Sequence, residues 1–229
     1  MTRTTLRRLP LTGLVAGAFL IGCGTADAAA SNSIPSPAAD APLAAVKGQD
    51  SVVFAGGCFW GIQAVFQHVK GVLKATAGYS GGTLKDPGYE EVSSGTTGHA
   101  ESVLVVFDPS VVTFGSLLRV FFVSHDPTEL NYQGPDHGTQ YRSAIFFTTP
   151  DEKTAAQAYI DQLTKAKTFS RPIVTQVAAF TGFYRAEEYH QDFLIKNPTN
   201  DYIVINDQPK LVRLKQQLPE LYMATPAPF

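Results

Sequence analysis

Hydrophobic and polar positions follow one another along the chain in segments that predict strands and helices in turn. Residues 51–55 form a short apolar run with β-branched side chains, bounded by Gly56 and Gly57, which predicts a buried strand. From Cys58 to about Lys70, apolar residues recur every three or four positions, which predicts a helix. The first unit is therefore a strand, a Gly-Gly turn and a helix, with a cysteine at the N-terminus of the helix.

The same reasoning predicts further strands and helices downstream. We expect strands at 72–78, 99–107, 141–148 and 172–180, and helices at 113–124, 154–167, 186–194 and 211–218. Strands interleaved with single helices indicate an α/β domain of two layers, with a mixed sheet around a ferredoxin-like βαβ core. Residues 79–98 and 126–139 carry turn-forming and polar residues and are predicted to be long loops, a feature that is usually functional in a compact domain.

The first residues of the chain have the pattern of an export signal. Three arginines lie among the first eight residues, and the apolar run at 11–22 is too short to span a bilayer. Residues 20–23 resemble a lipobox, in which Cys23 would be acylated and become the new N-terminus, whereas residues 26–28 offer an ordinary signal peptidase site. We therefore expect a signal peptide at 1–23 and a protein of the bacterial periplasm or cell envelope, anchored by lipid on Cys23.

Composition predicts the remaining organisation. Residues 24–49 are rich in alanine, serine and proline and are predicted to be a flexible tether, residues 50–222 the folded domain, and residues 223–229 a disordered tail. Hydrophobic residues make up 44% of the chain and charged residues 17%, which is enough apolar material for a core. The net charge of −2 gives no indication of a nucleic-acid partner, and we expect a monomer.

Cys58 is the candidate nucleophile. A thiol reacts through its thiolate, and the positive end of a helix dipole favours that anion. The neighbouring Phe59 and Trp60 could hold an apolar group such as a methyl attached to sulfur. The alternative is that Cys58 is a small core residue, as lone cysteines often are. The histidines lack metal-ligand spacing, so we expect no metal and no other cofactor.

Residues 57–61, Gly-Cys-Phe-Trp-Gly, resemble the GCFWG motif of the A-type peptide methionine sulfoxide reductases. Further segments similar to this family follow in the expected order, at 77–82, 89–92, 97–101, 125–127, 136–143 and 189–191. The resemblance covers roughly residues 51 to 198. It implies a peptide-methionine (S)-S-oxide reductase that acts on peptide-bound or free methionine S-sulfoxide.

The resemblance also implies roles for particular residues. Cys58 would attack the sulfoxide sulfur, and Glu101 would protonate the oxygen; burial at the head of an apolar strand would raise the pKa of Glu101 and keep it protonated. Hydroxyls of two tyrosines would bind the oxygen, and other side chains would hold the rest of the substrate. These residues are Tyr89 and Tyr141 for the oxygen, Phe59 and Trp60 for the methyl group, and Asp136 and His190 in supporting positions.

The reaction would leave a sulfenic acid on Cys58. Many family members carry recycling cysteines after an Asn-Pro pair, but residues 197–207 contain none. An external thiol, from a thioredoxin-like or glutaredoxin-like protein or a small molecule, would therefore reduce Cys58 directly. Combined with export, this predicts repair of oxidised envelope proteins.

Two other functions are compatible with parts of the sequence. A Cys-His acyl-transfer hydrolase would use Cys58 with His190 or His137 as the base. A tethered binding lipoprotein would use the aromatic pocket only to capture a ligand, and would keep its function after Cys58→Ser.

Overall fold

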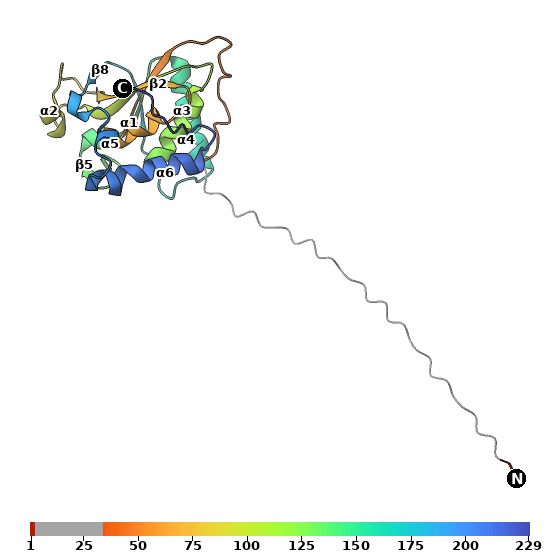
Figure 1. Ribbon diagram of the computed structural model, residues 1–229. Helices are drawn as coiled ribbons and strands as arrows, with labels where there is room; N and C mark the ends of the chain where they lie inside the picture. The colour runs from red at the N-terminus through yellow and green to blue at the C-terminus, as the bar shows by residue number, and fades with distance from the viewer. Residues whose placement is uncertain (3–33) are drawn as a thin grey trace. The chain divides into compact units, whose positions relative to one another are not determined.

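The computed structural model describes residues 1–2 and 34–229. One six-stranded mixed sheet organises residues 34–229 (Figure 1). The strands lie in the order β7-β6-β1-β3-β2-β8. Their bounds are β1 Asp50–Gly56, β2 Val72–Ser80, β3 Ala100–Phe107, β6 Ser143–Phe147, β7 Gln176–Ala179 and β8 Phe183–Arg185. Only β6 and β7 pair in parallel; the other neighbours are antiparallel. The sheet is therefore mixed, as predicted.

Two interlocked βαβ units form the centre of this sheet. Strands β1 and β2 both run antiparallel to β3, which lies between them, and α1 (Phe59–Gln67) connects them. Strands β3 and β6 both run antiparallel to β1, and α3 (Phe114–Ser124) follows β3 on the way to β6. The resulting order β6-β1-β3-β2 is the ferredoxin-like arrangement. The predicted α/β fold class is confirmed.

The core explains why the first strand is apolar at consecutive positions. Val52 and Phe54 belong to the main core cluster, whereas Val53 and Ala55 pack into a second cluster, so that both faces of this central strand are covered. The Phe54 ring stacks on Phe66 of α1 and on Phe121 of α3, each with centroids 4.9 Å apart. Burial of each such ring contributes about 1.5–3 kcal/mol to folding. These contacts fix α1, and with it Cys58, against the sheet.

The remaining helices differ from the predictions mainly at their ends. Helix α4 (Pro150–Lys165) begins four residues earlier than predicted, because Thr149 and Glu152 form a capping box and Pro150 occupies the first turn. Helix α6 (Gln208–Gln217) likewise begins with a proline in its first turn and follows a π-helical segment, η3 (Ile203–Asp207). Within the described residues, no helix combines the length and apolar character needed to cross a membrane.

The predicted helix at 186–194 is wrong. The chain forms strand β8, a 3₁₀ turn η2 (Glu188–His190) and the short helix α5 (Phe193–Lys196) instead. The buried Gln191 side chain bonds both the N–H and the C=O of Ala77, so this segment follows the edge of β2. Asp192 then adopts a positive φ of 57°, which interrupts a regular helix.

The two predicted loops contain short elements that carry side chains toward one face. The first loop holds α2 (Tyr89–Ser93), and the second holds β4 (Tyr132–Gln133), β5 (Asp136–His137) and the 3₁₀ turn η1 (Thr139–Tyr141). Because strands β4 and β5 pair with each other, the second loop is an ordered hairpin.

Residues 34–49 pack against the domain, which corrects the predicted flexible tether over this range. Ile34 is buried, and its carbonyl accepts a hydrogen bond from Arg119 Nε at 2.8 Å. The Asp40 carboxylate accepts from the Gly115 N–H at 3.1 Å, at the N-terminus of α3, where a negative charge is favoured. The folded unit therefore begins before Asp50. The predicted signal peptide, Cys23 and residues 24–33 lie outside the described residues.

The C-terminal residues 223–229 also pack against the domain, although the composition predicts disorder. The N–H groups of Met223 and Ala227 donate to the carbonyls of His68 and Gln67, each at 2.7 Å. The Ala75 N–H donates to the Pro228 carbonyl at 3.1 Å. Main-chain hydrogen bonds thus hold this segment, and Ala227 and Met223 pack against the main core.

Candidate active site

A tight turn places Cys58 at the start of α1. Gly57 has a φ of +88°, and a Cβ at this position would lie 2.5 Å from Gln133 Cγ, so glycine is required. Cys58 occupies the N-cap position of α1, as predicted. Gln133 in turn holds the second loop: its side-chain oxygen accepts from the Asp126 N–H, and its side-chain NH₂ donates to the Asp126 carbonyl. The turn that precedes Cys58 is therefore packed directly against the loop that completes the site.

Cys58 lies in a cavity of about 210 Å³. Its walls come from α1, α2, β3, β5, η1 and the start of the π-helical segment. The lining residues are Cys58, Phe59, Trp60, Tyr89, Glu101, Asp136, Tyr141 and Tyr202. One cysteine, two carboxyl groups and three phenols thus converge beside an aromatic wall.

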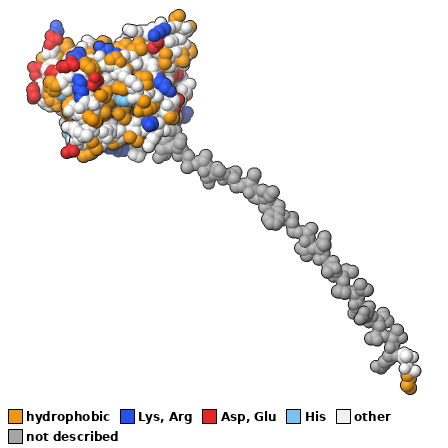
Figure 2. All heavy atoms as spheres, viewed as in Figure 1, with side chains coloured by type: hydrophobic (Ala, Val, Ile, Leu, Met, Phe, Trp, Pro, Cys, Tyr) orange, Lys and Arg blue, Asp and Glu red, His pale blue; other side chains and the backbone are white. Residues whose placement is uncertain are grey.

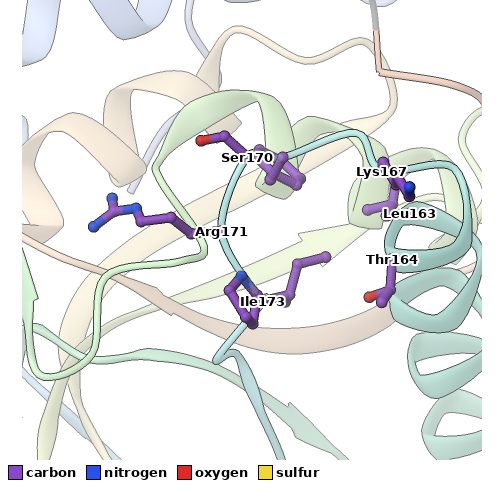
Figure 3. Close-up of a pocket in the computed structure, with 8 residues that line it drawn as sticks. Leu163, Thr164, Lys167, Ser170, Arg171 and Ile173 are labelled. Carbon is purple, nitrogen blue, oxygen red and sulfur yellow. The ribbon is translucent and has the colours of Figure 1, made fainter.

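A second cavity, of about 270 Å³, lies beside the C-terminal end of α4 (Figure 3). Leu163, Phe169 and Ile173 line it, and Arg171 pairs with Asp126 at 2.9 Å. Although it is the larger of the two, this cavity contains neither a cysteine nor a carboxyl group in its lining. The chemistry of the side chains therefore assigns reactivity to the cavity at Cys58.

Glu101 is a buried acid at the beginning of β3. Its side chain is 2% exposed, and its Oε2 accepts a hydrogen bond from the Phe59 N–H at 3.0 Å. Burial raises the pKa of Glu101 to about 8, an effect that the Phe59 N–H partly opposes and the charge of Asp136 increases. At neutral pH the carboxyl is therefore mostly protonated, which is the state that can donate a proton.

The resting thiol of Cys58 is also protonated at neutral pH. Burial raises its pKa well above the ordinary value, and the Glu101 carboxyl acts in the same direction when it is ionised. The Trp60 N–H and the charge of Lys210 lower the pKa but do not compensate. The expected stabilisation of the thiolate by the helix N-terminus is thus outweighed by loss of solvent.

Three phenols surround the polar end of the cavity. Burial raises the pKa of Tyr89 and of Tyr141, so that both hydroxyls remain hydrogen-bond donors. Burial likewise raises the pKa of Tyr202, whose hydroxyl donates to Asp136 Oδ2. The Tyr89 main chain is anchored by its N–H, which donates to Glu187 Oε1 at 2.8 Å.

Trp60 forms the aromatic wall together with residues from the C-terminal part of the chain. Its ring stacks on Phe193 with centroids 3.8 Å apart and meets the Tyr202 ring edge-on at 5.7 Å. Trp60 Nε1 donates to His190 Nδ1 at 3.1 Å, and His190 is 2% exposed and does not line the cavity. His190, for which a supporting position was predicted, therefore lies behind the wall and holds Trp60 by this bond.

Comparison with known proteins identifies the family. The family described as peptide methionine sulfoxide reductase matches residues 50–221. Peptide methionine sulfoxide reductase MsrA 2 of Mesorhizobium japonicum is 58% identical over 183 residues, covering 80% of this chain and 94% of its own. The protein of the same name from Synechocystis sp. is 51% identical over 190 residues, covering 82% and 89%. This chain belongs to the A-type peptide methionine sulfoxide reductases.

Solved structures of A-type reductases share the fold. Mxr1 from Saccharomyces cerevisiae in reduced form has a TM-score of 0.62 at 33% identity, covering 66% of this chain and 87% of its own. Methionine sulfoxide reductase A of Corynebacterium diphtheriae has a TM-score of 0.60 at 34% identity, covering 67% and 77%. The resemblance that the sequence motifs indicated is confirmed.

Seven of the eight predicted site residues of this reductase line one cavity, and His190 is the exception. The prediction did not include Tyr202, nor a buried ion pair between Asp207 and Lys210 beside α1. No motif marked these three residues, and each reaches the site through contacts between segments far apart in sequence. The bond from Tyr202 to Asp136 spans 66 residues.

The geometry does not favour a Cys-His hydrolase. Neither His190 nor His137 lines the cavity, and His190 Nδ1 already accepts the Trp60 bond. The His137 side chain is exposed and its ring stacks on Tyr132 at 5.2 Å. A base for acyl transfer is therefore lacking next to Cys58 in the described residues.

The protein surface at α2, beside the Cys58 cavity, is acidic. Figure 2 shows carboxylate side chains gathered at the edge of the molecule where Figure 1 labels this helix. Asp86, Glu90 and Glu91 are exposed there, whereas Tyr89 of the same helix lines the cavity. Solvent screens such exposed charges, so titration of the reductase site depends mainly on its buried groups.

Proposed function

We propose that this reductase acts on the S epimer of methionine sulfoxide by attack of Cys58 Sγ on the sulfoxide sulfur, with Glu101 as the acid. The observation that carries this proposal is the shared cavity: a cysteine at a helix start lies beside a buried carboxyl that is protonated at neutral pH. Sulfoxide sulfur becomes electrophilic when its oxygen accepts a proton. A thiol alone would lack that assistance.

The step balances without a further reactant. The Glu101 proton passes to the sulfoxide oxygen while Cys58 Sγ bonds to the substrate sulfur, and the thiol proton replaces the one that Glu101 gave. The hydroxyl oxygen then passes from the substrate sulfur to Cys58 Sγ, and the bond between the two sulfurs breaks. Methionine is released. The substrate sulfur is reduced by two electrons, and Cys58 is oxidised by two electrons to a sulfenic acid.

The remaining lining residues separate the polar and apolar parts of the substrate. Hydroxyls of Tyr89 and Tyr141 would donate to the oxygen as negative charge develops on it. Phe59 and Trp60 would receive the methyl group on the apolar side. A sulfoxide of the opposite configuration would exchange the places of its oxygen and methyl group, which predicts selectivity for one epimer.

Regeneration would require a thiol from outside the described chain. Cys58 is the one cysteine among residues 34–229, so no second cysteine in this range can form a disulfide with it. A thioredoxin-like or glutaredoxin-like protein, or a small thiol, would attack the sulfenic acid, release water and leave a mixed disulfide. A second thiol then frees Cys58.

A single-turnover assay tests this function. Residues 34–229 are mixed with separated S and R epimers of a methionine sulfoxide peptide, without added reductant. We expect about one methionine per enzyme from the S epimer, because the Cys58 thiol supplies two electrons and can reduce one sulfoxide. We expect none from the R epimer, because its oxygen and methyl group would exchange places in the pocket. Equal turnover of both epimers would contradict the proposed pocket, and product from neither would contradict the proposed chemistry.

We also propose that the full-length chain is exported and repairs oxidised proteins of the cell envelope. The motivation is the arginine-rich start, the apolar run and the lipobox-like residues ending in Cys23. We expect the wild-type protein in the membrane fraction and Cys23→Ala released from it. A cytosolic protein with an intact N-terminus would contradict export, whereas release of both forms into the periplasm would contradict only the lipid anchor.

A further inference from the structure

A buried ion pair lies beside the reactive cysteine at the junction of η3 and α6. Lys210 Nζ donates to Asp207 Oδ1 at 2.8 Å, and the two residues are 6% and 0% exposed. Removing two charges from water is costly, so a buried pair is weak evidence for a gain in stability. The π-helical turn that presents Asp207 is also a feature found frequently at functional sites.

The pair packs directly against the first turn of α1. A Cβ on Gly61 would lie 2.2 Å from Asp207 Oδ1 and 2.9 Å from Lys210 Nζ, so only glycine allows this approach. Gly61 follows Cys58 by three residues, which places it one turn along the helix that the cysteine begins. The carboxylate and ammonium therefore lie against the backbone that orients the nucleophile.

One oxygen of the pair remains unsatisfied. Asp207 Oδ2 is buried and has no hydrogen-bond partner among the described residues. A buried acceptor without a partner lowers the stability of the fold, and each such atom in a native structure calls for an explanation. A purely structural pair would be expected to satisfy both carboxylate oxygens.

We propose that Asp207 and Lys210 are positioning residues for the reduction step, fixing the first turn of α1 and setting the balance of charge around the Cys58 sulfur. This role rests on the proposed function only for the identity of the reaction. The negative charge that develops as the thiol loses its proton is stabilised by the Lys210 ammonium. Asp207 holds that ammonium against Gly61, and its own negative charge opposes the stabilisation of charge on the sulfur.

The surrounding charges support opposite roles for the two members of the pair. The charge of Lys210 lowers the pKa of both Cys58 and Glu101, and the charge of Asp207 raises both. The titratable groups of neighbouring elements whose charges interact with the pair are Cys58, Glu101, His125, Asp136 and Tyr202, and Arg213 is a further cation on α6 itself. The Arg213 guanidinium donates to the carbonyls of residues 123 and 124. Lys210 is the cation whose charge lowers the pKa of Cys58.

Alkylation of the resting enzyme by iodoacetamide, measured against pH, tests the pair. Lys210→Met should raise the apparent pKa of Cys58 alkylation, and Asp207→Asn should lower it. Each unit of the shift corresponds to about a tenfold change in thiolate at pH 7. Lys215→Met removes an exposed ammonium from the same helix, which lies over the Tyr222 ring, and should leave the profile unchanged.

Opposite shifts separate this role from a structural one. If both substitutions move the profile in the same direction, or leave it unchanged while the melting temperature falls, the pair only stabilises the fold. Should Lys210→Met fail to fold, Asp207→Asn and the charge-preserving Lys210→Arg decide: Asp207→Asn must still react faster at pH 7 than either wild type or Lys210→Arg. Because alkylation needs no sulfoxide, this test can fail while the epimer assay succeeds.

Discussion

Replacing Cys58 with serine will abolish single-turnover reduction of the S epimer. A hydroxyl is a far weaker nucleophile than a thiolate, and serine has no oxidation state equivalent to a sulfenic acid that could accept the oxygen. We expect a loss of about 10³-fold or more, the size associated with removal of a covalent nucleophile. The measurement is methionine formed per enzyme with residues 34–229.

Serine is also a closely matched replacement. Cys58 is 7% exposed and belongs to the main core cluster, so a side chain of similar shape preserves the packing. The melting temperature of the variant should stay within a few degrees of wild type, and dimedone should label only the wild-type enzyme after exposure to substrate. Substantial methionine formation by a folded Cys58→Ser protein would contradict the assignment of Cys58 as the nucleophile.

The sequence predicted best those parts of the molecule in which local pattern and tertiary burial agree. The run at 51–55 is apolar at consecutive positions because β1 is covered on both faces, and the apolar residues of α1 recur at helical spacing because the helix is buried. The Gly-Gly turn and Cys58 between them follow directly from these two elements.

The prediction failed where contacts between distant segments determine the conformation. No local pattern shows that Gln191 bonds the edge of β2, or that Asp192 adopts a positive φ. Residues 34–49 and 223–229 cannot form a core by themselves, and they are held by hydrogen bonds and by single core residues, Ile34 and Ala227, against a domain that other residues build. Composition describes what a segment can bury by itself, and it does not describe such docking.

The electrostatics of the site could be predicted only in part. Burial of Glu101 follows from its place in an apolar strand, and its raised pKa was correctly expected. The state of Cys58 was not, because the dipole of α1 is visible in the sequence whereas the depth of burial and the Asp207–Lys210 pair are not.

Glu101→Gln should lower the single-turnover rate by about 10²–10⁴-fold, the usual contribution of general acid catalysis. Glutamine can accept the Phe59 N–H bond through its carbonyl and fits the same space, but it cannot transfer a proton. Because the pKa of Glu101 is about 8, the wild-type contribution from this acid should fall as the pH rises through 8. The amide that replaces the carboxyl does not titrate, so this part of the pH profile should be absent in the variant.

Protein stability provides an independent check on the same carboxyl. Folding raises the pKa of Glu101 from 4.5 to about 8, so the folded state holds a proton that the unfolded state releases between these values. The contribution of Glu101 to stability is therefore fully present below pH 4.5 and is lost as the pH rises to about 8, above which it changes no further. Glu101→Gln lacks this loss, and its melting temperature should gain on wild type between pH 5 and pH 8. A constant difference across that range, together with a rate close to wild type, would show that Glu101 is neither buried in its acid form nor the proton donor.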